Sequence, residues 1–377
     1  MRRETIFVFT IACALVMIGL LMVYSANTGR AYSNGKLDEH VSYVYLYNQL
    51  ILVGIGFAAL LVTAGFDYHS FRNRGVLWLL VSGTLALLVL VLVFGDERRG
   101  GLRWLNILGF QFQPSELAKF ALVILLAVKL SENQGHLKSF GRGFLPPMVI
   151  TAVFAGLVLL EQDLGTPAIM VAVAMLMIIL AGGRWIHVGM TWAPAAAVLG
   201  AMIVISPYRI ERLYAFMDPW KFRTGKGLQL IESLAGFARG GLWGKGLGAG
   251  EQKLLYLPDA HSDFIFAVWG EEMGLVGTMG LILLFALLLF MAVRIAISAK
   301  DLFGSLLASG IVSLILVQAT FNMGVTTGLL PTKGLVLPFI SAGGSALIVN
   351  LAMIGVLINV GKQAYEREDG YRNALAA

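Results

Sequence analysis

The stretch LPDAHSDFIFAVWGEEMG, from Leu257 to Gly274, joins a polar segment directly to an apolar one. Asp263 stands at the junction, and the acid pair Glu271 and Glu272 follows within the apolar part. An ionisable group near the centre of a bilayer costs roughly 2.5–3.5 kcal/mol on insertion scales, so such residues are usually functional. The stretch therefore predicts a membrane helix with one carboxylate at its polar end and two more below it.

The composition extends this prediction to the whole chain. Of 377 residues, 58% are hydrophobic and only 13% are charged, against about 25% charged in globular domains. A bilayer core of about 30 Å needs about 20 helical residues. Apolar windows cover residues 5–26, 45–66, 75–94, 115–131, 145–160, 167–182, 188–206, 263–292, 303–327 and 338–361. We predict an all-α polytopic membrane protein of about ten transmembrane helices in a single domain, 1–377.

Orientation follows from the basic residues of the short connections. When the eight basic residues of the long loop 207–262 are left out, 13 Lys and Arg fall on the side that carries Arg2 and Arg3 and 7 on the other. By the positive-inside rule this places both termini in the cytoplasm. The connection 207–262 is the one long loop, and we expect it to face outward. It is rich in Gly and basic residues, but its apolar residues argue against disorder, and Gln229–Phe237 predicts a short interfacial helix.

A second polar intrusion into the apolar pattern is RRGGLRWLNILGFQFQPSELAKF, residues 98–120. Pro114 and Ser115 open a helix, and Glu116 and Lys119 share one of its faces because they are three residues apart. One interpretation is an ion pair that locks this helix to its neighbours. The other is a polar wall of a substrate cavity.

Two further breaks carry charged residues. In EQDLGTP, residues 161–167, Asp163 has the chemistry of a helix cap or of a site residue, and the break itself predicts a tight outer turn or a partly re-entrant loop. In GLLPTKGLVLPFISAGGSAL, residues 328–347, Pro and Gly predict a broken helix start, and such backbone is tolerated where it lines a cavity. Lys333 belongs at its outer mouth, either in the site or snorkelling to water.

The acids of the opening stretch allow the same pair of interpretations. Asp263 either caps its helix or acts in a site, and His261 either orients Asp263 or lies on the surface. Glu271 and Glu272 are expected mainly to bond to other helices. Basic residues outside the membrane suit an anionic partner, and a pyrophosphate-linked lipid fits a basic loop above apolar helices. Nucleic acid is excluded by location.

Several segments, in order along nearly the whole chain, resemble the SEDS family (shape, elongation, division and sporulation) of peptidoglycan polymerases. They are VMIGLLMVYSA, RWLNILGFQFQPSELAK, EQDLGTPAI, RLYAFMDPW, GLWGKGLGAGEQKLLYLPDAHSDFIFAVWGEEMG and GLLPTKGLVLPFISAGGS. LYLPDAHSDFIFAVWGEE and LLPTKG are more similar to the cell-division branch, FtsW, than to the elongation branch, RodA. Ala342 departs from the family pattern, which often has an aromatic hydroxyl there; Asp259 and Ser262 replace Glu and Thr and keep their chemistry.

The resemblance implies a glycosyltransferase that polymerises lipid II at the outer face of a bacterial cytoplasmic (inner) membrane during septal wall synthesis. Asp263 matches the family's essential Asp, the general base on the acceptor sugar hydroxyl, with undecaprenyl pyrophosphate leaving. The candidate substrate-binding residues are Arg103, Glu116, Lys119, Asp163, Arg212, Lys245, Lys253, His261 and Lys333.

The resemblance also implies partners: a class B penicillin-binding protein (a transpeptidase), other division proteins and membrane lipids. The five His residues show no metal-ligand spacing, and whether a divalent cation assists the pyrophosphate is left open. Three alternatives stay beside the main interpretation. They are a lipid II flippase, a RodA-like elongation polymerase, and a scaffold for division partners, which would not need Asp263.

Overall fold

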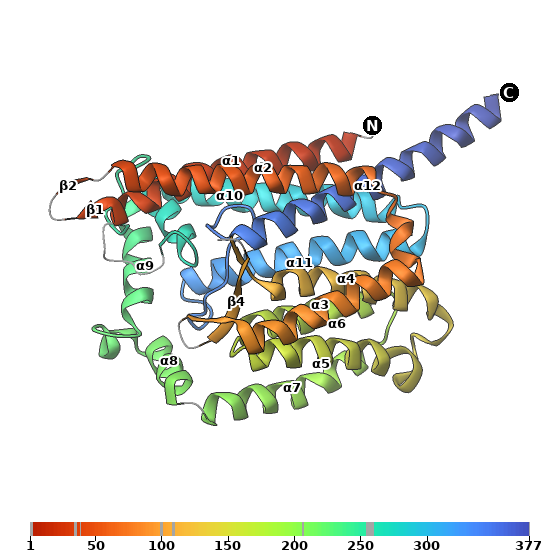
Figure 1. Cartoon of the computed structure of the whole chain (residues 1–377), viewed down its shortest axis with the longest axis horizontal. Helices are drawn as coiled ribbons and strands as arrows, with labels where there is room; N and C mark the ends of the chain where they lie inside the picture. Colours follow the sequence, from red (N-terminus) through yellow and green to blue (C-terminus); the bar gives the residue numbers. More distant parts are fainter. Residues whose placement is uncertain are drawn as a thin grey trace.

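Long helices run back and forth between two ends of a bundle in the computed structural model of the chain (Figure 1). The structure describes residues 3–33, 36–37, 39–98, 101–107, 110–205, 207–253 and 260–376. The lengthwise helices are α1 (Arg3–Ala31), α2 (Glu39–Gly65), α3 (Arg74–Phe94), α4 (Pro114–Glu132), α5 (Leu145–Leu160), α6 (Gly165–Leu180), α7 (Trp185–Ile205), α10 (Ile265–Ile297), α11 (Leu302–Thr326) and α12 (Gly344–Ala376).

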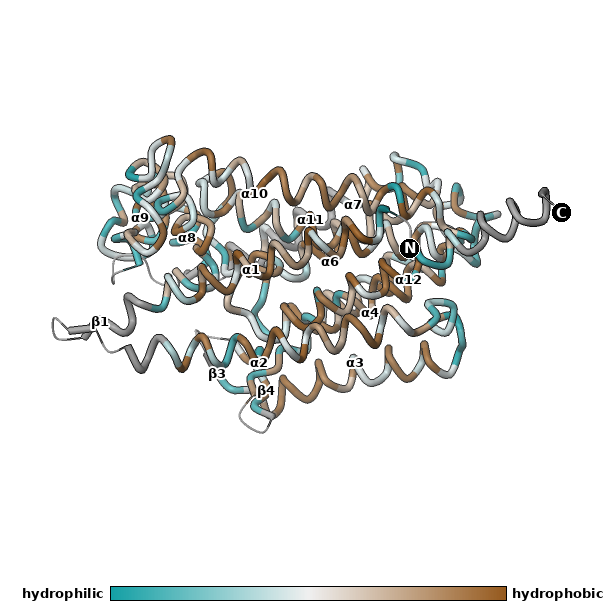
Figure 2. The backbone as a smooth tube through the Cα atoms, turned by 90° about the horizontal axis from the view of Figure 1, so that it is seen from above, coloured by the Kyte–Doolittle hydropathy of each residue, from teal (hydrophilic) through white to brown (hydrophobic). Residues whose placement is uncertain are grey.

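The prediction of an all-α, multi-pass membrane protein is confirmed. Each apolar window of the sequence falls on one of these helices, and seven of the described helices have the length and composition of a membrane span. Helix α6 is apolar but shorter. Figure 2 shows hydrophobic residues along the middle of the bundle and hydrophilic residues gathered toward its two ends. The exact number of ten spans stays a prediction.

The chain begins and ends at the same end of the bundle, and the long loop lies at the opposite end (Figure 1). The loop is more helical than predicted: it contains α8 (Pro207–Met217), the short 3-10 helix η4 (Pro219–Phe222) and α9 (Leu228–Gly240). Helix α9 confirms the predicted helix at Gln229–Phe237, whereas α8 was not predicted. Residues 254–259, with Asp259 among them, lie outside the described residues.

Short antiparallel strands and turns connect the helices. Strands β1 (Tyr32–Ser33) and β2 (Lys36–Leu37) pair with each other, and β3 (Asp96–Arg98), β4 (Gly101–Ile107) and β5 (Phe110–Phe112) form a three-stranded sheet in that order. The remaining short turns are η1 (Tyr68–Arg72), η2 (Gln134–His136) and the π-turn η3 (Phe140–Phe144). The sequence did not predict the sheet β3–β4–β5, because its strands are short and mixed in polarity.

Helix α4 occupies the middle of the bundle. It contacts α3, α5, α6, α11 and α12, and most of its side chains are buried. It begins at Pro114, whose missing N–H suits the first helical turn, so the predicted start is confirmed. Glu116 and Lys119 therefore lie inside the protein. Helices α2 and α12 pack along each other although they come from opposite parts of the chain.

Helix α10 contains one break, at Gly274, where φ is +65° and ψ is −164°. Only glycine adopts such a backbone without strain. The Gly-rich loop after α9 fills the break: Leu275 and Val276 donate their N–H groups to the carbonyls of Gly241 and Leu242 at 2.9 and 3.1 Å. Polar backbone at this place is thus satisfied by protein rather than by lipid, as a membrane protein requires.

Candidate active site

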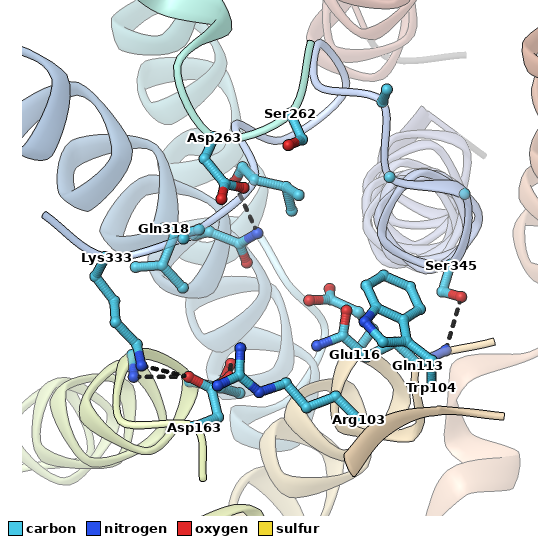
Figure 3. A pocket seen from close by; sticks show the side chains of 18 of the residues that line it. Arg103, Trp104, Gln113, Glu116, Asp163, Ser262, Asp263, Gln318, Lys333 and Ser345 are labelled. Atoms are coloured by element: carbon cyan, nitrogen blue, oxygen red, sulfur yellow. Dashed lines mark hydrogen bonds and ion pairs between the residues drawn. The ribbon is translucent and has the colours of Figure 1, made fainter. Parts of the chain in front are cut away.

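A cavity of about 1490 Å³ opens where the broken start of α12, the beginning of α10 and the turn between α5 and α6 meet. Figure 3 shows charged side chains from several elements directed into it. Seven of the residues predicted from the sequence line this cavity: Arg103, Glu116, Asp163, Arg212, His261, Asp263 and Lys333. Segments far apart in the chain therefore build one site.

Asp263 is half-buried and lies two residues before the start of α10. Its backbone is held firmly, because the Asn322 side chain donates to the Asp263 carbonyl at 2.9 Å and the Ser341 hydroxyl donates to the Ser262 carbonyl at 2.5 Å. A Cβ at Gly334 would come within 2.5 Å of the Asp263 carboxylate. The absence of a side chain there lets the 328–343 segment approach the carboxylate closely.

His261 lines the same cavity. Its carbonyl accepts a hydrogen bond from the N–H of Ala342 at 3.0 Å, so the segment before α10 and the segment before α12 are joined at two adjacent points. Ala342 also lines the cavity. At this position the chain offers backbone contact where an aromatic hydroxyl was expected from the family pattern.

Asp163 is buried, and its carboxylate both bonds to the start of α6 and pairs with a lysine that lines the cavity. Its carboxylate accepts from the N–H of Gly165, the first residue of α6, at 3.0 Å and from the hydroxyl of Thr166 at 2.7 Å. It also forms an ion pair with Lys333, with Nζ and Oδ1 separated by 3.3 Å. Burial alone would raise the pKa of Asp163, but the positive charges of Lys333 and Arg103, with these hydrogen bonds, lower it below its usual value. Asp163 is therefore an anion at neutral pH.

Lys333 does not snorkel away from the protein. Its side chain is only 24% exposed and bends toward Asp163 (Figure 3). Burial lowers the pKa of Lys333 below its usual value. The Asp163 carboxylate acts to raise this pKa, and the positive charge of Arg103 lowers it further. The polar turn EQDLGTP, which forms a tight turn rather than a re-entrant loop, is thus joined to the LPTKG segment across the cavity.

Arg103 extends from β4 to the turn between α5 and α6. Its guanidinium donates to the carbonyls of Glu161 and Gln162 at 3.4 and 2.8 Å. Gln162 has a positive φ of 61°, a conformation that is uncommon outside glycine and that clusters at functional sites. A Cβ at Gly101 would come within 2.8 Å of the Glu161 carbonyl, so the strand can approach this turn only as glycine.

Glu161 stands directly before this turn and is fully buried. Its two carboxylate oxygens have no hydrogen-bond partner among the described residues. Burial, and next the negative charge of Asp163, raise the pKa of Glu161 to about 8, although Arg103 acts in the opposite direction. Glu161 is therefore neutral at pH 7, and it leaves the positive charge of Arg103 available to the cavity.

The Glu116–Lys119 pair lies at the inner wall of the cavity. Lys119 donates to Glu116 at 2.9 Å and to the side-chain oxygen Oε1 of Gln318 at 2.6 Å. The Gln318 side-chain amide in turn donates to the backbone carbonyl of Val336 at 3.0 Å. Glu116 lines the cavity, while Lys119 lies behind it. The pair therefore both joins α4 to α11 and forms part of the wall. The sequence analysis did not single out Gln318, which is one of two amides, with Asn322, in the apolar window 303–327.

Two of the predicted substrate-binding residues, Lys245 and Lys253, lie elsewhere. Lys253 is buried and bonds to Glu272 at 2.6 Å, to the Ser25 hydroxyl at 2.7 Å and to the Gly248 carbonyl at 2.7 Å. Lys245 pairs with Glu251 of the loop at 3.1 Å and with Glu271 of α10 at 3.4 Å. Neither lysine lines the cavity. The basic residues of the loop suggested a ligand site. Spacing along the loop does not reveal that these lysines pair with acidic residues of α10.

Glu271 and Glu272 are the acids concerned, and both are fully buried. Glu271 accepts from the backbone N–H groups of Glu251 and Gln252 at 3.1 and 3.0 Å. Glu272 accepts from the Ser25 hydroxyl at 2.6 Å as well as from Lys253. The prediction that these two acids bond to other helices is only partly correct, because most of their partners belong to the Gly-rich loop.

Arg209 of α8 adds a further cation to the cavity wall, and the rest consists of apolar, aromatic and neutral polar residues. The aromatic and neutral polar ones are inconspicuous in the sequence. They include Asn48 and Gln49 of α2, Trp104 and Gln111 of the β4–β5 hairpin, and Gln113. Within the described part of the chain, no three His, Cys, Asp or Glu side chains gather as metal ligands.

The arrangement of these motifs can now be compared with known proteins. Residues 5–366 match the family FTSW_RODA_SPOVE, described as "Cell cycle protein". The chain belongs to this family, the SEDS proteins. The family match covers all of the residues that line the cavity.

Curated SEDS relatives and solved SEDS structures agree with this assignment. The chain is 42% identical over 359 residues, 95% of each protein, to the "Probable peptidoglycan glycosyltransferase FtsW" of Geobacter metallireducens. It is 39% identical to "Stage V sporulation protein E" of Bacillus subtilis over 93% of this chain and 95% of that protein.

Among solved structures, a chain described under "Structural coordination of polymerization and crosslinking by a peptidoglycan synthase complex" has a TM-score of 0.77 and 29% identity, covering 95% of this chain and 97% of that chain. The Thermus thermophilus rod shape determining protein RodA has a TM-score of 0.69 and 28% identity, covering 95% and 96%. The SEDS fold therefore extends over nearly the whole chain.

Proposed function

We propose that this chain, a peptidoglycan glycosyltransferase of the SEDS family, polymerises lipid II into glycan strands with Asp263 as general base. One observation carries the proposal: a single cavity holds the Asp263 carboxylate together with Arg103, Arg212 and Lys333. A carboxylate facing several cations suits a reaction that removes a proton from one substrate and releases a pyrophosphate from another.

In the proposed step, the acceptor's sugar hydroxyl attacks the anomeric carbon of the donor. The bond between that carbon and the pyrophosphate oxygen breaks, and undecaprenyl pyrophosphate leaves with the bonding electrons. The hydroxyl proton passes to the Asp263 carboxylate. A sugar hydroxyl is too weak an acid to be fully deprotonated by a carboxylate, so proton transfer accompanies bond formation.

Asp263 cannot supply the whole rate enhancement. General-base catalysis contributes roughly 10²–10⁴-fold, and the remainder comes from substrate positioning and from charge stabilisation of the leaving group. Arg103 and Lys333 suit the second task because their positions are fixed by the turn at Gln162 and by Asp163. Arg binds phosphate oxygens with a bidentate fork, and Lys acts as a point charge.

The location proposed for the reaction is the outer face of the cytoplasmic membrane. The charge pattern of the short connections supports termini in the cytoplasm. The elements β4 and α8, which carry residues of the cavity, lie away from the termini (Figure 1). Relatives named FtsW at 40–42% identity support a role in septal synthesis. A solved relative belongs to a peptidoglycan synthase complex, which supports a class B penicillin-binding protein as partner.

The decisive experiment is polymerisation of purified lipid II by wild type and by Asp263→Asn, each bound to its transpeptidase. We expect glycan strands from wild type and none from the variant. Glycan synthesis by Asp263→Asn at the wild-type rate would overturn the mechanism. Absence of product from both proteins, with the partner shown to be bound, would favour the flippase or scaffold alternatives.

A further inference from the structure

We infer that the cavity is divided into a charged side and a neutral side, and that the neutral side binds the N-acetylated sugar of the acceptor. This inference rests on the proposed glycosyl transfer and names the place of one of its two substrates. The specificity-determining residues that it adds are Asn48, Gln49, Trp104 and Gln111, which come from α2 and from the β4–β5 hairpin.

The charged side is built from the turn between α5 and α6, the LPTKG segment and α8. It holds the Asp163–Lys333 ion pair, with Arg103 directed to the same turn, and Arg212 donates to the Thr332 carbonyl at 3.3 Å. Figure 3 shows Lys333, Asp163 and the guanidinium of Arg103 on one side of the pocket, and Trp104, Gln113 and Ser345 on another. Glu116 also lies on the second side, where its carboxylate is paired with Lys119. The two kinds of side chain are therefore separated in space.

The neutral side offers the groups that recognise an uncharged sugar. Amide side chains both donate and accept hydrogen bonds, so Asn and Gln match hydroxyl and acetamido groups. An indole such as Trp104 presents a flat apolar face and a polar edge. Trp104 is half-buried and Gln111 is exposed, so both can be reached from the cavity.

The chemistry of the two substrates matches this division. The donor brings a pyrophosphate to the reacting carbon, and that group needs cations. The acceptor brings only a sugar hydroxyl and its neutral neighbours to the same place, because its own pyrophosphate lies at the far end of the disaccharide. A cation-lined side therefore fits the donor, and an amide-lined side fits the acceptor. Asp263 borders the cavity that both share.

The helix α2 adds a second observation. Its residues Tyr45, Asn48, Gln49, Leu52 and Ile55 all line the cavity, and their spacing places them on one stripe of the helix. The stripe is polar toward the end where α2 begins and apolar further along. A lipid-linked sugar has the same order of polarity, with its sugar in the headgroup region and its prenyl chain deeper in the membrane.

The hairpin that completes the neutral side is fixed to the bundle. The Ser345 hydroxyl accepts from the N–H of Gln113 at 2.9 Å and donates to the Gln111 carbonyl at 3.2 Å. The same sheet carries Arg103, which reaches the charged side. The sheet β3–β4–β5 thus holds the two sides at a constant separation, which suits a transfer between two bound substrates.

The test uses two substrates that can be varied independently. A lipid II analogue whose terminal sugar lacks the accepting hydroxyl serves only as donor, and the methyl glycoside of the N-acetylated disaccharide, which has no pyrophosphate and cannot donate, serves only as acceptor. The variants are Asn48→Ala/Gln111→Ala, Lys333→Gln and, as matched control, Gln134→Ala, an exposed amide of η2 at the other end of the bundle. Asn48 and Gln111 are exposed, so their replacement leaves the fold intact.

We expect the double variant to raise the acceptor KM about tenfold, the effect of losing two ordinary hydrogen bonds, and to keep the donor KM within about twofold. Lys333→Gln should show the reverse pattern, and Gln134→Ala should change neither. An equal rise of both KM values in the double variant, or an unchanged acceptor KM, would overturn the division.

Failure of the proposed function is distinguishable from failure of this inference. If wild type transfers no sugar, the proposed function fails. Direct binding of the methyl glycoside to the detergent-solubilised proteins then tests whether the neutral side binds the sugar. Weaker binding by the double variant than by wild type and Gln134→Ala would support the neutral subsite. Equal binding by all three proteins would refute it.

Discussion

Two groups of buried charges lie near the beginning of α10, and they are built in opposite ways. In the first, Lys253 is enclosed by Glu272, Ser25 and a backbone carbonyl, and Glu271 is capped by two backbone N–H groups. In the second, Asp263, Lys333 and Arg103 border a cavity of about 1490 Å³. The first group satisfies its charges within the protein, whereas the second presents them to a space that a substrate can occupy.

The comparison separates stability from activity. A buried charge that loses its partner costs about 3–5 kcal/mol, so the enclosed group stabilises the junction of α1, α10 and the Gly-rich loop. The open group is also held in place, Lys333 by Asp163 and Arg103 by two carbonyls, but its side chains line a space that a ligand can enter. Sequence alone placed Lys253 and Lys333 in the same class of candidates. The structure places Lys253 in the enclosed group and Lys333 in the group that borders the cavity.

The strongest contrast is expected from Asp263→Asn. The change keeps the size of the side chain but removes the base, so polymerisation should fall by about 10²–10⁴-fold while the midpoint of thermal unfolding stays near that of wild type. Glycan assays and unfolding in detergent, performed on the same preparations, measure the two effects. A loss of folding equal to the loss of activity would contradict the distinction between the groups.

The converse change is Lys253→Met. It leaves Glu272 buried without its cation, and we expect the free energy of unfolding to fall by about 3–5 kcal/mol. Lys221→Met is the matched control, because Lys221 pairs with Asp218 on the surface and its side chain is 77% exposed. Exposed pairs contribute at most about 1 kcal/mol. Similar losses in both variants would show that the enclosed group has no special role.

Lys119 tests a residue that belongs to both kinds of group. Lys119→Ala leaves Glu116 without its partner, whereas Lys119→Arg keeps a positive charge near it. We expect the alanine variant to be less stable than the arginine variant by roughly 3 kcal/mol and to lose more activity. Equal losses in stability and activity assays would indicate a specific ammonium contact instead of a charge pair.

The smallest expected effect concerns Glu161 and pH. The pKa of Glu161 in the folded protein is about 8, above its usual value of 4.5. The folded state therefore binds more protons than the unfolded state between these values, and stability falls as pH rises through this range. From pH 6 to pH 8 the loss is about 2 kcal/mol. Glu161→Gln should remove this part of the pH dependence in thermal unfolding, and an unchanged slope would refute it.

The helices and most of the cavity residues could be predicted because they depend on local pattern. Apolar windows of sufficient length indicate membrane helices, and polar residues that interrupt them, such as Asp263, Asp163 and Lys333, are conspicuous. The pairing of Lys253 with Glu272 could not be predicted, because spacing along a chain does not say which loop folds back on which helix. The sheet β3–β4–β5 was missed because its strands are too short for a periodic signal.

The neutral residues of the cavity were missed for a different reason. Asn48 and Gln49 stand near the polar end of a membrane helix, where amides are ordinary, and nothing in the sequence connects them to Gln111. Their relation appears only when α2 and the hairpin are placed around one space. An uncharged binding surface gives a weaker sequence signal than a buried charge does, because its burial carries a smaller energetic penalty.

The close packing of α2 against α12 has a consequence for biosynthesis. A ribosome delivers α2 long before α12, and Ser345, at the beginning of α12, anchors the hairpin that carries Trp104. The cavity therefore stays incomplete until α12 has entered the membrane. A nascent or truncated chain that ends before Gly344 therefore lacks a complete cavity and cannot polymerise glycan. Only a chain whose α12 is inserted can act on the precursors around it.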